Sequence, residues 1–297
     1  MKQNPTPNSF KAWVLAARPK TLTAASVPVL IGGALAYIYG HLQATPFLLC
    51  LLFAYLMQID ANFINDLYDF LKGTDREDRL GPERACAQSW ITVPAMKKGI
   101  LITTLLAACC GLCLLIYSGW EMIPVGLACI LFAFLYTAGP YPLAYHGWGD
   151  VLVLVFFGFV PVGCTYYVMG HGWNTAVTMG SLACGLTIDT LLMVNNFRDR
   201  DQDRQSGKKT LVVRLGAKAG LILYFLLGLV ACWCCFYFIG LGKPLAAILP
   251  QIYLLPHILT TMKMARIHQG KALNAILGET SRNILIFGML LTIGLAL

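Results

Sequence analysis

The sequence predicts an all-α integral membrane protein with nine transmembrane helices, and three observations predict this class. Hydrophobic residues make up 58% of the 297 residues and charged residues only 12%, whereas a soluble domain carries about 25% charged residues. The apolar residues fall into runs long enough to cross a bilayer. Most charged residues lie between those runs. Together these observations exclude a soluble enzyme, a disordered chain and a nucleic-acid-binding protein.

The apolar runs define the helices in order along the chain. A helix needs about 20 apolar residues to cross the hydrocarbon core of a bilayer. Nine segments meet this requirement, at about 21–40, 45–64, 98–118, 121–138, 150–170, 174–195, 219–241, 244–263 and 280–297. Pro250 and Pro256 lie inside the eighth segment and predict a kink there. Most links between segments are short, but those at roughly 66–97 and 196–218 are long and charged.

The positions of the basic residues predict the topology. With nine crossings, alternate links lie on opposite sides of the membrane. Every lysine and arginine except Lys243 falls in or beside the N-terminal segment, the two long links or the link before the last helix. Basic residues concentrate on the cytoplasmic side of membrane proteins. We therefore expect a multi-pass cell-membrane protein with its N-terminus and both long links in the cytoplasm and its C-terminus outside.

Two polar clusters indicate an internal repeat. One cluster follows the second predicted helix and the other follows the sixth, so the same pattern recurs four helices later. We expect a single domain over residues 1–297, built as a repeat of helices 1–4 and 5–8 with a ninth helix added.

Each cluster places aspartate and asparagine side chains one helical turn apart, which makes a polar stripe on a helix. The first contains Asn62, Asn65, Asp66 and Asp69, and the second contains Asn195, Asn196, Asp199 and Asp203. Like charges at this spacing repel, so the stripes need a counter-charge. Oxygen ligands without histidine or cysteine suit a hard cation such as Mg²⁺ or Ca²⁺. Hydrophilic helix ends with incidental ion pairs are the alternative, but two matching clusters on one membrane face weigh against it.

A lipid with a diphosphate head group and an apolar tail would fit both the charged clusters and the apolar helices. Mg²⁺ completes its coordination shell with phosphate oxygens. Loss of diphosphate from an allylic prenyl diphosphate leaves a carbocation, which needs a dry pocket and aromatic faces. Several tyrosines lie near this level of the membrane. Tyr136, at the end of the fourth predicted helix, is the strongest candidate among them.

The motifs resemble those of the UbiA superfamily of intramembrane aromatic prenyltransferases. Asn65-Asp66-x-x-Asp69 and Asp199-x-x-x-Asp203 are similar to the two aspartate-rich motifs of that family. Finer features resemble its menaquinone branch, including Ala17-Arg18-Pro19-Lys20-Thr21-Leu22, Lys72-Gly73-Thr74-Asp75 and Gly207-Lys208-Lys209-Thr210. The resemblance spans nearly the whole chain. It implies nine helices around a central cavity, with a cytoplasmic cap made from the two aspartate-rich loops.

The resemblance also implies roles for individual residues. Asn65, Asp66, Asp69, Asp199 and Asp203 would be catalytic and would hold Mg²⁺ and the diphosphate, with Tyr136 as a further catalytic residue. Lys72, Arg198 and Lys208 would contact the diphosphate. Asp75, Asn195 and Asn196 would support this shell. Arg84 and Asp189 are candidates to contact the aromatic acceptor.

The implied reaction transfers a polyprenyl group from polyprenyl diphosphate to 1,4-dihydroxy-2-naphthoate. Carbon dioxide is lost, and the products are demethylmenaquinol and diphosphate. We expect the bilayer and these two substrates as partners, with no nucleic acid and no obligate protein partner. Residue spacing alone leaves other acceptors open, such as 4-hydroxybenzoate or homogentisate. A secondary transporter is the alternative from another class, although transporter carboxylates tend to lie near the middle of the membrane.

Overall fold

The computed structural model describes residues 5–74 and 79–297, and these residues form helices without any β-strand. The helices are α1 (Phe10–Ala17), α2 (Leu22–Ile38), α3 (Ala44–Leu71), α4 (Val93–Ser118), α5 (Ile123–Thr137), α6 (Gly149–Val153), α7 (Val160–Gly170), α8 (Thr175–Gln205), α9 (Leu211–Leu215), α10 (Ala217–Cys234), α11 (Pro244–Ile248), α12 (Leu254–Ile267) and α13 (Leu273–Ala296). Short 3₁₀ and π segments adjoin them, namely η1 (Pro19–Thr21), η2 (Trp120–Met122), η3 (Leu143–His146), η4 (Leu154–Phe159), η5 (Cys235–Leu241) and η6 (Leu249–Tyr253).

Nine helical units in the described part of the chain are long and apolar enough to cross a membrane, which confirms the predicted class. Several of these helices run further than predicted, and two of them extend through the polar clusters. α3 continues to Leu71 and α8 to Gln205, because hydropathy marks the bilayer crossing while the helix ends only near a glycine with positive φ. These glycines are Gly73 and Gly207. Both polar clusters therefore lie on continuous helices, which keeps their side chains in register.

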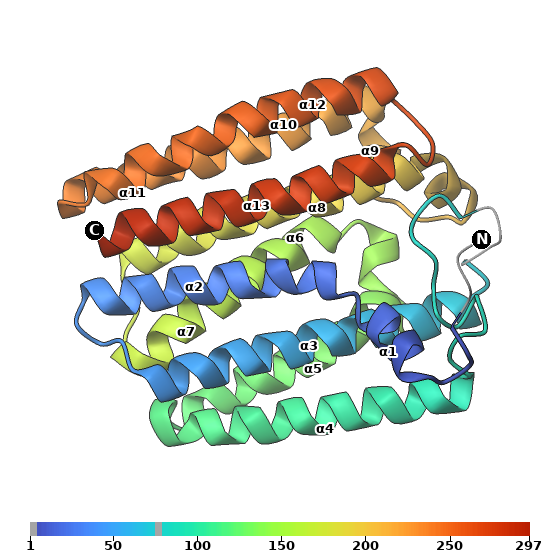
Figure 1. Ribbon diagram of the computed structural model, residues 1–297, viewed down its shortest axis with the longest axis horizontal. Helices are drawn as coiled ribbons and strands as arrows, with labels where there is room; N and C mark the ends of the chain where they lie inside the picture. The colour runs from blue at the N-terminus through green and yellow to red at the C-terminus, as the bar shows by residue number, and fades with distance from the viewer. Residues whose placement is uncertain (1–4, 75–78) are drawn as a thin grey trace.

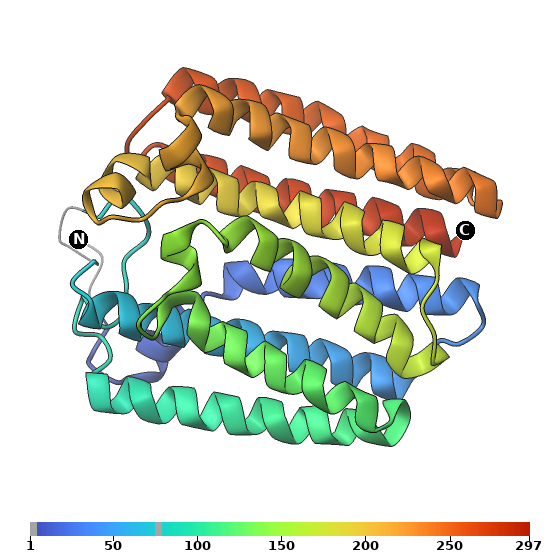
Figure 2. The same ribbon diagram turned by 180° about the vertical axis from the view of Figure 1, so that it is seen from behind.

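The helices run side by side as one bundle (Figures 1 and 2). α10, α11 and α12 lie along one side and α4 lies along the opposite side, with α2, α7 and α8 between them. Small residues allow close contact where lipid supplies no hydrophobic driving force. For example, a Cβ atom on Gly288 of α13 would lie 2.4 Å from Val27 Cγ1 of α2. The sequence predicts a kink in the eighth span at Pro250 and Pro256. Its α-helix is interrupted at Pro250, which lies in the 3₁₀ segment η6 between α11 and α12, whereas Pro256 lies inside α12.

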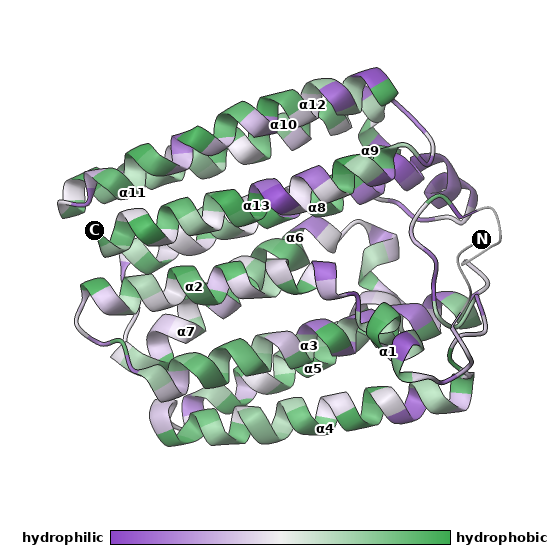
Figure 3. Cartoon of the chain, in the orientation of Figure 1, coloured by the Kyte–Doolittle hydropathy of each residue, from purple (hydrophilic) through white to green (hydrophobic). Residues whose placement is uncertain are grey.

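Polar residues gather at one end of the bundle (Figure 3). This end holds the described parts of both long connections, and the C-terminus lies at the opposite end (Figure 1). The two polar clusters are thus brought to the same end, as predicted. That this end faces the cytoplasm stays a prediction.

Candidate active site

A cavity of about 530 Å³ opens inside the bundle between α2, α3, α4, α5, α7 and α8. Most of its wall is apolar. Its polar lining residues are Arg18, Thr21, Gln58, Asn62, Asn65, Tyr136, Thr165 and Asn195. Among the described residues that line it, Arg18 is the only one with a charged side chain. Such a cavity suits an apolar tail with a polar head group at one end.

Arg18 reaches the cavity because the chain turns sharply between α1 and α2. Its φ is +52°, in the left-handed region, which ends α1. Asn62 of α3 fixes this turn by donating from Nδ2 to Ala17 O (3.0 Å) and to Thr21 Oγ1 (3.0 Å). Arg18 Nη2 then lies 3.8 Å from Asp66 Oδ2.

The first aspartate of the first cluster is held by backbone amides. Asp66 is fully buried, and its two carboxylate oxygens accept hydrogen bonds from the N–H groups of Ala85 and Cys86, both at 2.8 Å. The loop after α3 therefore folds back over the helix that carries the cluster. Asn65 Oδ1 accepts from Thr137 Oγ1 at 2.9 Å, which ties the cluster to the end of α5.

The second cluster is held by basic side chains. Asp199 accepts from Arg198 Nε (2.7 Å) and from Arg198 Nη2 (2.6 Å). Arg198 Nη1 donates to Asn274 Oδ1 of α13 at 2.9 Å. One turn further along α8, Asp203 Oδ1 lies 3.6 Å from Lys208 Nζ.

Tyr145, in η3 between α5 and α6, joins the two clusters. Its ring contacts two ammonium groups, with Lys72 Nζ 4.9 Å and Lys208 Nζ 4.7 Å from the centroid. Its hydroxyl lies 3.3 Å from Asp69 Oδ1 and 3.2 Å from Thr74 Oγ1. Cation–π contacts of this kind are worth about 0.5–2 kcal/mol each. Tyr145 therefore positions both lysines and the second aspartate of the first cluster.

The two lysines differ in how firmly they keep their charge. Burial lowers the pKa of Lys72, against the attraction of Asp69, and repulsion from Lys208 adds to the lowering. Burial opposes the charge on Lys208 too, but the attraction of Asp69 and Asp203 prevails and raises its pKa. Burial raises the pKa of the Tyr145 hydroxyl, and Asp69 adds to that rise. Lys208 is therefore the firmer of the two cations.

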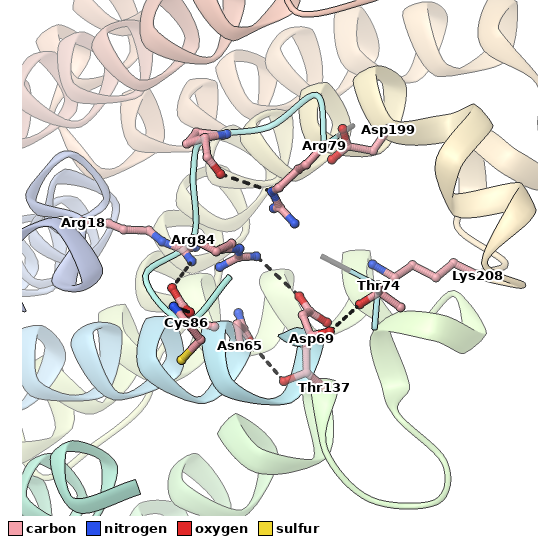
Figure 4. A network of polar contacts seen from close by, with 12 residues as sticks. Arg18, Asn65, Asp69, Thr74, Arg79, Arg84, Cys86, Thr137, Asp199 and Lys208 are labelled. Carbon is pink, nitrogen blue, oxygen red and sulfur yellow. Dashed lines mark hydrogen bonds and ion pairs between the residues drawn. The ribbon is translucent and has the colours of Figure 1, made fainter. Parts of the chain in front are cut away.

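Two arginines of the loop after α3, Arg79 and Arg84, complete this network (Figure 4). Arg84 Nη2 lies 3.4 Å from Asp69 Oδ2. Burial lowers the pKa of Arg79, against the attraction of Asp199 and Asp69. In the described network the basic side chains outnumber the carboxylates of the two clusters. They are Arg18, Lys72, Arg79, Arg84, Arg198 and Lys208. This end of the bundle therefore attracts a polyanion.

The structure brings most of the predicted site residues together but separates some of them. Tyr136 and Asn195 line the cavity, and Asn196 of the second cluster is buried without lining it. Arg84 contacts Asp69 but does not line the cavity, and it lines a second pocket together with Arg79 and Lys271. Asp189 is buried outside the cavity lining. Asp75 lies outside the described residues. The roles of all these residues stay predictions.

Sequence reasoning did not assign a role to four residues that shape the site, namely Arg18, Gln58, Tyr145 and Asn274. Arg18 stood only in a family motif, and no spacing pattern marks Gln58 as a cavity residue. Asn274 Nδ2 donates to Leu80 O at 2.7 Å, so this residue joins Arg198 to the loop after α3. Such contacts between distant positions leave no local periodic signal in the sequence.

The donor set of the two clusters fits Mg²⁺. Within the described chain no three or more histidine, cysteine or acidic side chains converge as a ready-made metal centre. The available ligands are carboxylate and amide oxygens, and each carboxylate oxygen has a second lone pair. Mg²⁺ is usually bound by one or two carboxylates, with water and substrate phosphates completing its shell. The arrangement therefore fits a cation that arrives with a diphosphate.

Comparison with known proteins agrees with this geometry. The UbiA prenyltransferase family profile matches residues 25–290. A UbiA homologue from Aeropyrum pernix superposes with a TM-score of 0.69 at 14% identity, covering 92% of this chain and 96% of that one. A UbiA homologue from Archaeoglobus fulgidus bound to GPP and Mg²⁺ superposes with a TM-score of 0.67 at 14% identity, covering 94% and 99%.

Two curated relatives have a higher sequence identity to this chain than these structures. The chain is 40% identical over 212 residues to 1,4-dihydroxy-2-naphthoate octaprenyltransferase of Escherichia coli, covering 69% of each chain. It is 36% identical over 234 residues to the protein of that name from Haemophilus influenzae, covering 76% of each chain.

The fold and the paired clusters at the cavity define a multi-pass membrane protein of the intramembrane prenyltransferase class. The chain belongs to the UbiA prenyltransferase family.

Proposed function

We propose that this protein transfers a polyprenyl group from polyprenyl diphosphate to 1,4-dihydroxy-2-naphthoate, as a step of menaquinone biosynthesis. The observation that carries the proposal is the position of two carboxylate clusters and their cations beside the polar lining of an apolar cavity. The acceptor is inferred from the relatives named above. The alternative acceptors and the transporter have no such support.

Mg²⁺ bound with the diphosphate would be held by oxygens of Asn65, Asp66, Asp69, Asp199 and Asp203. When bound, the cation offsets the negative charge that develops on the leaving diphosphate. Lys72, Arg198 and Lys208 would hold the remaining phosphate oxygens by charge-assisted hydrogen bonds. The arrangement supports these roles because the three basic side chains already contact or adjoin the clusters.

The cavity would hold the first part of the prenyl tail and would exclude water from the reacting carbon. The allylic C–O bond breaks, and its electron pair leaves with the diphosphate. The acceptor ring carbon that bears the carboxylate then forms a bond to the allylic carbon. As CO₂ leaves, the electron pair of its bond restores the aromatic ring. The ring of Tyr136, in the cavity wall, would stabilise the allylic cation.

We further propose that residues 1–297 form one domain with an internal four-helix repeat. Its polar end would face the cytoplasm, where the diphosphate-bearing head group and the anionic acceptor would enter the site. The distribution of basic residues supports this orientation. Cysteine labelling of the loop at Gly207 and of Leu297 in intact cells tests it, because only the second position would react with an impermeant reagent.

A product assay tests the function. The purified protein would receive Mg²⁺, a radiolabelled polyprenyl diphosphate and either 1,4-dihydroxy-2-naphthoate or 4-hydroxybenzoate. A decarboxylated prenyl-naphthoquinol from the first acceptor alone is the expected result. Prenylation of only 4-hydroxybenzoate would overturn the acceptor assignment. EDTA should stop the reaction and added Mg²⁺ should restore it, so activity that resists EDTA would contradict the metal requirement.

A further inference from the structure

Among the described residues that line the cavity, two buried polar atoms have no hydrogen-bond partner. They are Arg18 Nη2, which is a donor, and Gln58 Oε1, which is an acceptor. Both residues line the cavity beside the first cluster. A buried polar group without a partner costs about 1–3 kcal/mol, so a donor and an acceptor in one cavity wall indicate a ligand that satisfies both.

Arg18 keeps this donor free because its neighbour is already satisfied. Arg18 Nη2 is 3.8 Å from Asp66 Oδ2, which gives charge attraction without a hydrogen bond. Both oxygens of Asp66 accept backbone N–H groups instead, each at 2.8 Å. The guanidinium is therefore held in place by the carboxylate while one of its nitrogens is available to another anion.

The side chain of Gln58 is oriented by Asn62, one turn further along α3. Gln58 Nε2 donates to Asn62 Oδ1 at 3.4 Å, so Oε1 is the atom left without a partner. Asn62 in turn holds the turn that carries Arg18, through Ala17 O and Thr21 Oγ1. Asn62 thus contacts both the Gln58 side chain and the turn from which Arg18 extends, and both residues line the same cavity.

We propose that Arg18 and Gln58 form the binding site for the aromatic acceptor. Arg18 Nη2 donates to the ring carboxylate, and Gln58 Oε1 accepts from a ring hydroxyl. A hydroxynaphthoate carries these two groups on adjacent ring carbons, so its chemistry matches one cationic donor beside one neutral acceptor. This inference rests on the proposed function for the identity of the acceptor, but the site itself is read from the cavity.

Arg18, and not Arg84, then binds the carboxylate of the aromatic acceptor. Arg84 contacts Asp69 at 3.4 Å and lines the second pocket, together with Arg79 and Lys271. Arg18 instead lines the cavity that would hold the prenyl tail. A carboxylate on Arg18 places the ring between the diphosphate site and the apolar wall, where the allylic carbon would lie.

Ligand binding without the prenyl donor tests the site directly. The probes are 1-hydroxy-2-naphthoate, 2-naphthoate, which lacks the hydroxyl, and 1-naphthol, which lacks the carboxylate. Naphthalene fluorescence would report Kd in detergent with Mg²⁺ and inorganic diphosphate present. Arg18→Gln should weaken binding of 1-hydroxy-2-naphthoate about 10- to 100-fold and leave 1-naphthol unchanged. Gln58→Leu should weaken it about 2- to 10-fold and leave 2-naphthoate unchanged.

Arg84→Gln is the matched control, since it removes one arginine from the same end of the protein. It should bind the three probes like the wild type, while its KM for polyprenyl diphosphate rises. Size-exclusion profiles and thermal unfolding would check that each variant is folded. If Arg18→Gln does not fold, Arg18→Lys keeps the charge but loses the planar donor pair, and the same selective loss for the carboxylate probes is expected.

Two results would overturn the proposal. One is an equal loss for all three probes in folded Arg18→Gln, which would show a structural role. The other is unchanged naphthoate binding with a raised KM for polyprenyl diphosphate, which would place Arg18 on the diphosphate. Failure of the proposed function would look different, because the wild type would then bind aromatic carboxylates selectively but form no prenyl-naphthoquinol.

Discussion

The two aspartate clusters face the same site but are supported by different chemistry. In the first cluster, Asp66 is held by the backbone N–H groups of Ala85 and Cys86. In the second, Asp199 and Asp203 are paired with the side chains of Arg198 and Lys208. Backbone donors cannot move without refolding the loop, whereas a lysine or arginine side chain can turn to another anion.

This difference assigns different tasks to the two halves of the site. Asp66 of the first cluster is fixed by the loop and holds the Arg18 guanidinium near the cavity by charge attraction. The second cluster carries cations that can exchange a carboxylate for a phosphate oxygen when the substrate arrives. We therefore expect variants of Asp66 to change stability and activity together, and variants of Asp199 and Asp203 to change activity with little effect on stability.

The largest expected effect compares Asp203→Asn with Asp66→Asn. Each should lower turnover by about 100- to 1,000-fold, the usual loss when one electrostatic contact to the reacting group is removed. Asp66→Asn should also lower the free energy of unfolding by about 1–3 kcal/mol, because an amide cannot accept both backbone N–H groups through its two ends. Turnover and thermal unfolding of the two variants would be measured together. If the two variants had the same free energy of unfolding, the proposed difference between the two clusters would be wrong.

Tyr145 offers the next largest effect, since it joins the clusters. Tyr145→Leu removes the ring that contacts Lys72 and Lys208 and should raise the KM for polyprenyl diphosphate about 10-fold. Tyr145→Phe keeps the ring and loses only the hydroxyl near Asp69, so a rise of about 2- to 5-fold is expected. Steady-state kinetics with varied donor would separate the two. A larger loss in the phenylalanine variant would argue against the ring as the positioning element.

The two lysines predict a pH dependence. The pKa of Lys72 lies below its ordinary value of 10.5, so Lys72 loses its proton at a lower pH than Lys208, whose pKa is raised. Diphosphate affinity should therefore weaken as pH rises toward 10.5, by up to about 10-fold. Lys72→Met should remove this alkaline decline, and Lys208→Met should retain it. Calorimetry would measure the affinity for inorganic diphosphate as pH rises toward 10.5. An affinity that stays constant with pH in Lys208→Met but declines in Lys72→Met would contradict this assignment.

The smallest expected effect concerns the bridge between the clusters. Asn274→Ala frees Arg198 Nη1 and Leu80 O, and should lower turnover about 2- to 5-fold through looser positioning of Arg198. Asn283→Ala is a control on the same helix, where Asn283 donates to Thr260 Oγ1 within the bundle. It should lower the unfolding temperature but leave turnover unchanged. Matched losses of turnover in both variants would remove the special role of Asn274.

Much of this fold was predictable from the sequence, because its signals are local. The nine spans follow from apolar runs, and the two polar stripes follow from the helical period of residues such as Asp66 and Asp69. The helix ends were less predictable, since α3 and α8 continue beyond the hydrocarbon crossing. Hydropathy reports where lipid contacts the chain, and helical hydrogen bonding continues until a residue such as Gly73 interrupts it.

The partners of the site residues were not predictable in the same way. Tyr145 is far from Asp69 along the chain, and Asn274 is farther still from Leu80, so only packing brings them together. The same holds for Arg18, which lines the cavity, and Arg84, which does not. Composition and periodicity decide that a residue is basic and which helix it flanks. Which carboxylate it meets, and whether it lines the cavity, depends on a turn that Asn62 holds across more than forty residues of chain.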